Sequence, residues 1–155
     1  MLQIEARDLL FALENQDFDT TYYLDRQTGE ITPAFGEMFE PEDPEYVDEE
    51  ALRADPRYLP IDPISSNEGF RWMEQFAATV TDRRLQERLF AALDRRRPFR
   101  GFKDVLLEYS EEREAWFEYH EQRLLEAARE WLGVEGIEAE LTTRSTEAAP
   151  KRKGE

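Results

Sequence analysis

The hydrophobic periodicity of the chain changes near residue 65, and this change constrains the fold more than any other feature. Before it, short runs rich in β-branched and aromatic residues are typical of strands. These runs lie at 19–25, 30–32 and 57–61. After it, apolar residues recur every three or four positions, which is typical of helices. Strands followed by helices predict an α+β domain.

Local signals set the expected elements. A helix is predicted over 3–14, followed by a β-hairpin over 19–32 with Gly29 at its turn. Residues 57–61 form an edge strand, because Pro60 has no backbone donor. The later elements are a helix over 66–80 capped by Ser65, a helix after Asp82, a break marked by Pro98 and Gly101, a short helix over 102–109, a long helix from Ser110 ending at Gly133, and a strand over 134–141.

These elements predict a small three- or four-stranded antiparallel sheet with about four to five helices packed on one face. Residues 1–141 are expected to form a single globular domain, which a chain of 155 residues is long enough to stabilise. Within it, 37–55 is an acidic loop or insertion. Residues 142–155 are polar, end in a basic run and are expected to form a disordered tail.

The composition limits the chemistry. Cysteine is absent, which excludes thiolate metal sites, thiol catalysis and disulfides. His120 is the only histidine, and it shares a helical stripe with Trp116 and Leu124, which favours a structural role. No glycine-rich phosphate loop occurs. We therefore predict no catalytic residue, metal ligand or cofactor, and we lean against an enzyme.

Acidic residues dominate the segment 37–55, which has nine acids and one base and so carries −8 of the net charge of −16. It lacks the spacing of a calcium loop, so a solvated loop or a surface for a partner is favoured over a metal site. Its apolar residues either contact a partner or pin the loop to the core, and they are Phe39, Tyr46 and Val47. The candidate partner-binding residues are Glu40, Glu42, Asp43, Glu45, Tyr46, Asp48, Glu49 and Glu50.

Basic residues cluster over 95–103, at the end of one predicted helix and the start of the next. A phosphate group fits there, because free N–H groups at a helix N-terminus and nearby arginines both attract anions. Pairing of the arginines with the surplus carboxylates is the alternative. Arg95 belongs to the cluster, and the candidate residues for binding an anion or nucleic acid are Arg96, Arg97, Arg100 and Lys103, with Phe99 and Phe102 for base stacking.

Three functions follow from these patterns. The first is a non-enzymatic binding module that presents its acidic surface to a basic protein partner. The second is a phosphate or nucleic-acid binder at the basic cluster, and the third is a metal-dependent hydrolase using Glu74 with Asp104. The net charge of −16 disfavours an anionic membrane as partner. The N-terminus has no signal-peptide pattern, so a cytoplasmic location is expected.

An ordered series of motifs spans positions 5 to 132. The motifs are Tyr22-Tyr23-Leu24-Asp25, Thr28-Gly29-Glu30-Ile31, Tyr58-Leu59-Pro60-Ile61, Arg71-Trp72-Met73-Glu74-Gln75-Phe76, Pro98-Phe99-Arg100-Gly101-Phe102-Lys103-Asp104-Val105-Leu106, and Trp116 with Trp131-Leu132. The series resembles the bacterial uncharacterised protein family 0158. The resemblance implies one cytoplasmic domain and supplies no activity, cofactor or catalytic residue. By the same comparison, the acidic segment looks like a variable insertion.

Overall fold

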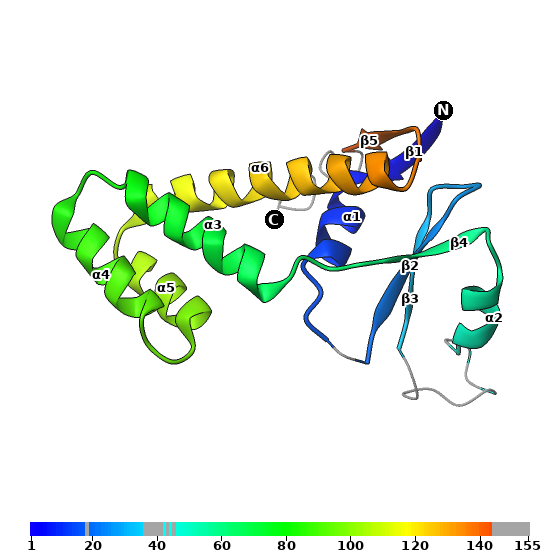
Figure 1. Cartoon of the computed structure of the whole chain (residues 1–155), viewed down its shortest axis with the longest axis horizontal. Coiled ribbons are helices and arrows are strands. Elements are labelled where there is room, and N and C mark those ends of the chain that lie inside the picture. The colour runs from blue at the N-terminus through cyan, green and yellow to red at the C-terminus, as the bar shows by residue number, and fades with distance from the viewer. Residues whose placement is uncertain (18, 36–41, 43, 45, 144–155) are drawn as a thin grey trace, which may run out of the picture. The chain divides into compact units, whose positions relative to one another are not determined.

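The computed structural model describes residues 1–17, 19–35, 42, 44 and 46–143 (Figure 1). These residues group into two compact units, where the sequence predicts one domain over 1–141. The first unit comprises the chain up to Pro63 together with the part from Ala127 onward, and the second comprises Ile64–Glu126. The fold is α+β, with six helices among the described residues.

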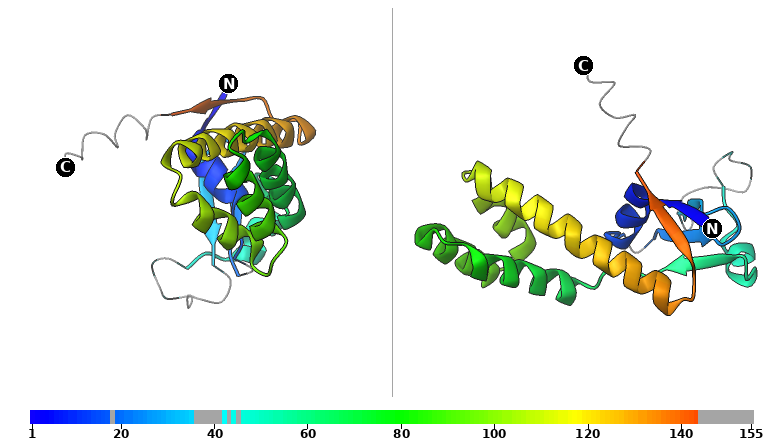
Figure 2. Two further views of the ribbon diagram at one scale, coloured as in Figure 1. Left: turned by 90° about the vertical axis from the view of Figure 1, so that its left-hand side faces the viewer. Right: turned by 90° about the horizontal axis from the view of Figure 1, so that it is seen from above.

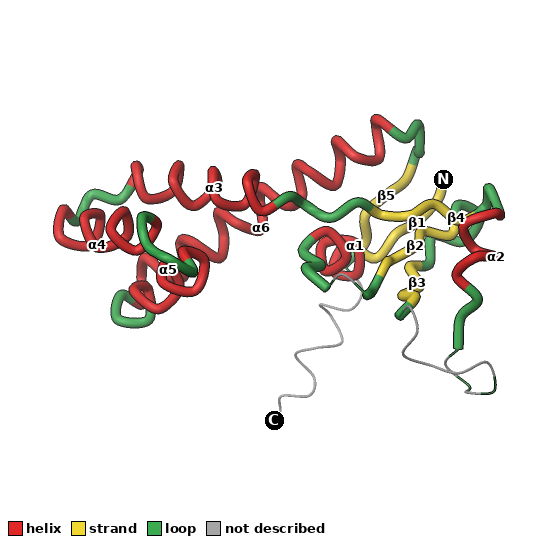
Figure 3. The backbone as a smooth tube through the Cα atoms, turned by 60° about the horizontal axis from the view of Figure 1, so that its bottom comes forward, coloured by secondary structure: helices red, strands yellow, loops and turns green. Residues whose placement is uncertain are grey.

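A three-stranded antiparallel sheet in the first unit confirms the predicted hairpin and edge strand (Figure 3). Its strands are β2 (Thr21–Asp25), β3 (Ile31–Ala34) and β4 (Tyr58–Ile61), in the order β3-β2-β4. Pro60 and Pro33 lie on the two edge strands, where a missing N–H costs no ladder hydrogen bond. Gly29 adopts φ +84° at the hairpin turn, as predicted.

A partly buried ion pair joins the hairpin to the start of β4. The Arg57 Nε and Nη2 atoms donate to the two carboxylate oxygens of Asp25, each at 2.8 Å, and the Gln27 N–H donates to the same carboxylate. These hydrogen bonds, led by those from Arg57, hold the pKa of Asp25 well below its usual range. A depressed pKa means that the pair stabilises the fold above the ordinary aspartate pKa, and the contribution disappears as the pH falls through the lowered value.

The beginning of the chain corrects one prediction. Residues 2–5 form a strand, β1 (Leu2–Glu5), and the first helix, α1, covers only Ala6–Leu13. The strand predicted at the end of the chain is confirmed as β5 (Ala139–Thr142), but it pairs in parallel with β1 instead of joining the antiparallel sheet (Figure 2). Ile4 is fully buried between polar neighbours, which is the alternation of a strand.

Four helices build the second unit. They are α3 (Ser66–Thr79), α4 (Arg83–Leu93), α5 (Pro98–Leu106) and the first part of α6 (Ser110–Val134). The Ser65 and Asp82 side chains accept hydrogen bonds from the N–H groups of Glu68 and Leu85, which confirms both predicted caps. The remaining helix, α2 (Glu49–Ala54), belongs to the first unit.

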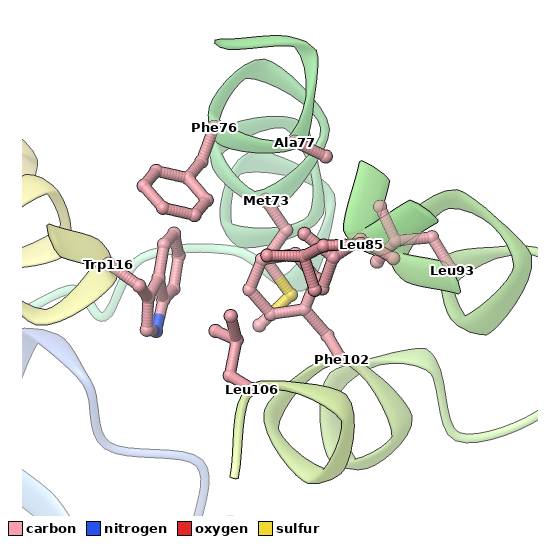
Figure 4. Close-up of a cluster of buried hydrophobic side chains, with 9 residues drawn as sticks. Met73, Phe76, Ala77, Leu85, Leu93, Phe102, Leu106 and Trp116 are labelled. Atoms are coloured by element: carbon pink, nitrogen blue, oxygen red, sulfur yellow. The ribbon is translucent and has the colours of Figure 1, made fainter. Parts of the chain in front are cut away.

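Aromatic and aliphatic side chains together form a buried core within this helical unit (Figure 4). The Trp116 ring centroid lies 5.4 Å from that of Phe76 and 5.0 Å from that of Phe102, both edge-on. His120 stacks on Trp116 at 5.0 Å with an interplanar angle of 11°. This contact supports the structural interpretation of His120.

Two glycines differ from their predicted roles. Gly133 lies inside α6, and the left-handed residue after this helix is Gly136, with φ +72°. The predicted break at Pro98 and Gly101 falls earlier, at 94–97, because Pro98 is the first residue of α5. A proline fits there, since the first N–H of a helix has no intrahelical partner. Gly101 is an interior position of α5.

Candidate anion-binding site

A pocket of about 410 Å³ lies where α4 ends and α5 begins. Four arginines line it, two from the turn after α4, one at the N-cap of α5 and one in the first turn of α5. These are Arg95, Arg96, Arg97 and Arg100. The remaining wall consists of Ala92, Gly101, Asp104 and Val105. The pocket therefore holds four positive charges and one negative charge.

Helix geometry and one close helix contact shape this pocket. Arg97 is the N-cap of α5, and Arg100 and Asp104 are four residues apart within the helix, so these two share one side of it. A Cβ atom at Gly101 would lie 3.4 Å from the Cβ of Ala92 on α4. The two helices therefore approach closely at this point, which brings the end of α4 beside the first turns of α5.

The arginines of the pocket have no internal counter-ion among the described residues. All four are exposed, and the ion pairs found among the described residues use other arginines. Those are Arg53, Arg57, Arg71, Arg88 and Arg123. The alternative prediction, that carboxylates neutralise the basic cluster, is thus not met within the described residues. Within the described ranges, no carboxylate therefore takes up the hydrogen-bond donors of these guanidinium groups.

Arg97 has a strained backbone at the centre of this site. Its φ of 55° and ψ of 56° are left-handed, and it is the only residue other than glycine with positive φ among those described. A side chain in this region costs about 1–2 kcal/mol, which is why glycine usually occupies it. Arg97 is also an N-cap without a capping side chain. Because strain concentrates at functional sites, it supports a role for the Arg97 side chain.

The comparisons with known proteins agree with one another. The family model described as "Uncharacterised protein family (UPF0158)" matches residues 1–149. The chain belongs to this family. Its sequence is also 31% identical over 149 residues to UPF0158 protein PA5073 of Pseudomonas aeruginosa, a match that covers 96% of this chain and 94% of the relative. No solved structure matches.

Membership of UPF0158 confirms the resemblance seen in the sequence. The family description names no activity, so the function has to be inferred from the charges and geometry of the site. Residues 83–103, which include the pocket arginines, contain eight bases and two acids. The helical unit as a whole contains eleven bases and thirteen acids, a net charge of −2, so the other unit carries −14 of the total −16. The charge is therefore divided unevenly between the two units, and the positive charge is locally concentrated at the pocket.

The two predicted aromatic candidates differ in burial. Phe102 is fully buried in the helical core, so its ring has no exposed face for a nucleic-acid base in this structure. It lies on the side of α5 that faces α3 and α6, where Phe76 and Trp116 contact its ring. Phe99 is partly buried against the same core. Lys103 is exposed but is not part of the pocket wall.

The acidic candidates are only partly described. Glu40, Asp43 and Glu45 lie outside the described residues, as does Phe39. Of the others, Asp48 caps α2, and Glu49 accepts hydrogen bonds from the Tyr23 hydroxyl at 2.8 Å and from Arg53 at 3.0 Å. Burial and the Glu49 hydrogen bond raise the pKa of Tyr23. Glu42, Tyr46 and Glu50 are exposed. Asp48 and Glu49 thus have structural roles that the sequence did not show.

In the described ranges, no group of three or more histidine, aspartate or glutamate side chains is arranged to hold a metal ion. The hydrolase pair Glu74 and Asp104 stays a prediction, although Asp104 does line the pocket. Among the helices that the structure describes, none has both the length and the apolar character that a bilayer crossing requires.

Proposed function

We propose that the protein is a binding module for ligands that carry phosphate groups, and that the pocket between α4 and α5 is the binding site. One observation carries this proposal: four exposed arginines, unpaired among the described residues, converge on one hollow of about 410 Å³. Planar guanidinium groups match the oxygens of phosphate in a two-point geometry, and they keep their charge at every physiological pH.

Binding fits this site better than catalysis. An arginine side chain does not give up its proton in a protein, so the four cations supply no general acid or base. Asp104 is the one titratable carboxylate of the wall, and a single carboxylate without a contrasting partner does not provide the acid and base pair of hydrolysis. The arrangement therefore favours holding an anion over transforming it.

The acidic surface remains a second proposal, and the geometry supports it less. A charge of −14 on the first unit favours a basic partner. Against this, the carboxylates of Asp48 and Glu49 already accept hydrogen bonds from groups within the chain. The pocket, in contrast, presents side chains with no internal role among the described residues. The phosphate-binding function is thus the one to test first.

Removing two pocket arginines is expected to weaken phosphate binding strongly. The double variant Arg96→Gln/Arg100→Gln loses two charge-assisted contacts, each worth about tenfold in affinity, so the affinity for inorganic pyrophosphate should fall about a hundredfold. Isothermal titration calorimetry at low ionic strength measures this change. Higher salt should weaken binding to the unmodified protein, because the pocket is open to solvent and its charges are screened.

A matched control is available on α4. Arg83 and Arg84 are exposed, lie outside the pocket and form no ion pair among the described residues. The variant Arg83→Gln/Arg84→Gln therefore has the same net charge as the pocket variant, and its affinity should change less than about threefold. Equal losses in the two variants would mean that net charge attracts the anion without a site. Failure of the unmodified protein to bind pyrophosphate or any other phosphate compound would disprove the proposal.

Arg97→Gly separates binding from folding. Glycine removes the left-handed strain at this position but raises the entropy of the unfolded chain, so we expect a net gain of about 0.5–1 kcal/mol in the free energy of unfolding. The same change removes one pocket cation, so pyrophosphate affinity should fall about tenfold. Urea denaturation and calorimetry measure the two effects. A loss of stability would show that the Arg97 side chain serves the fold, contrary to the proposal.

A further inference from the structure

The shape of the pocket determines what kind of phosphate compound fits it. The phosphates of a nucleic-acid strand lie along a line, and proteins that follow such a strand present a groove of cations. Here the four arginines surround one hollow, within six positions of the sequence. Cations gathered around one point match several phosphate groups joined directly to one another. This argument rests on the proposed function of the pocket.

The aromatic residues nearby argue against a single-stranded nucleic acid. Such ligands are held largely by stacking of their bases on exposed aromatic rings. Phe102 has no exposed surface, and a Cβ atom at Gly69 would lie 3.7 Å from the Phe99 ring, which places that ring against α3. Phe102 therefore offers no face to a base and Phe99 is partly buried, so the phosphate groups have to provide most of the affinity.

Asp104 is the feature that a simple anion site does not explain. Its carboxylate lies on the same side of α5 as Arg100, and it forms no ion pair among the described residues. A carboxylate repels a bare polyphosphate, which lowers the affinity of the pocket for inorganic anions. The same carboxylate accepts hydrogen bonds from hydroxyl groups. A ligand with both phosphates and a sugar satisfies all the charged groups of the wall.

The remaining wall and the volume fit the same ligand. Ala92 and Val105 give the pocket an apolar surface beside its arginines, which suits the carbon atoms of a sugar or base. A volume of about 410 Å³ falls within the range of small-molecule sites and exceeds the need of a single phosphate ion. We infer that the ligand is a nucleoside polyphosphate, with its phosphates on Arg96, Arg97 and Arg100 and a ribose hydroxyl donating to Asp104.

The test compares three ligands on the unmodified full chain and on two variants of it. Calorimetry with EDTA present measures the affinities for ATP, for GTP and for inorganic tripolyphosphate, which has the phosphate chain without the sugar. At least one of the two nucleotides should bind about tenfold more tightly than tripolyphosphate. The reason is that a nucleotide donates a ribose hydroxyl hydrogen bond to Asp104, which tripolyphosphate cannot do. In Asp104→Asn, removal of the repulsion should strengthen tripolyphosphate binding, and the preference for the nucleotide should fall below about threefold.

Asp94→Asn is the matched control, because Asp94 is exposed at the end of α4, lies outside the pocket wall and carries the same charge. Its preference for the nucleotide should equal that of the unmodified protein. If tripolyphosphate binds as tightly as both nucleotides, or if Asp104→Asn keeps the full preference, the inference is wrong while phosphate binding stands. Tighter binding of a single-stranded oligonucleotide would also overturn it. Failure of every phosphate compound to bind would refute the proposed function itself.

Discussion

Replacing Gly29 by alanine is expected to destabilise the first unit by more than about 4 kcal/mol, the range of the most damaging single substitutions. A Cβ atom at this position would lie 2.0 Å from the backbone oxygen of Gln3 and 3.0 Å from its carbonyl carbon, with φ at +84°. Because Gln3 belongs to β1, relief of the clash requires movement of the strand that pairs with β5. Urea denaturation followed by circular dichroism measures the loss.

Gly136→Ala separates this clash from backbone strain. Gly136 also has a left-handed φ, of +72°, but no heavy atom lies within 4 Å of the position that its Cβ would take. Alanine there should cost only the left-handed penalty of about 1–2 kcal/mol. If the two variants lose the same free energy of unfolding, the close approach of β1 to the hairpin turn is not what requires glycine at position 29.

Signals within a few residues were sufficient to predict most elements. The Ser65 and Asp82 caps, the Gly29 turn and the edge position of Pro60 each depend on chemistry inside one or two turns of chain. The strand β1 depends instead on a partner far along the sequence, since Leu2 pairs with Ala139. Four residues are also too few for a period of two to be distinguished from the start of a helix.

For the candidate site, too, the sequence predicts local features but not contacts between distant segments. The arginine cluster is a local feature, so the sequence revealed it, and the helical period places Asp104 on the side of α5 that carries Arg100. The hollow itself depends on the approach of Gly101 to Ala92, a contact between two helices. Phe99 and Phe102 are both aromatic and both near the cluster. Which of them is buried follows only from the positions of α3 and α6.

Phe102→Ala is expected to lower the free energy of unfolding of the helical unit by about 3–5 kcal/mol. The ring has no exposed surface, and its centroid lies 6.4 Å from that of Phe76 and 5.0 Å from that of Trp116, so its removal leaves a cavity in the core. Phe117→Ala is the control, since Phe117 on α6 is 52% exposed and should lose less than about 1 kcal/mol. Urea denaturation of both variants tests the difference.

The same variant distinguishes a core role from a stacking role for Phe102. A ligand that binds only the folded state stabilises it by about 2.7 kcal/mol at a hundred times its dissociation constant. If Phe102 acts only in the core, the remaining folded protein keeps the pocket arginines in place, and a nucleotide or pyrophosphate at that ratio adds the same increment to Phe102→Ala as to the unmodified protein. A nucleotide increment that shrinks in Phe102→Ala while the pyrophosphate increment is kept would instead show that the ring contacts the base, because pyrophosphate has no base to stack.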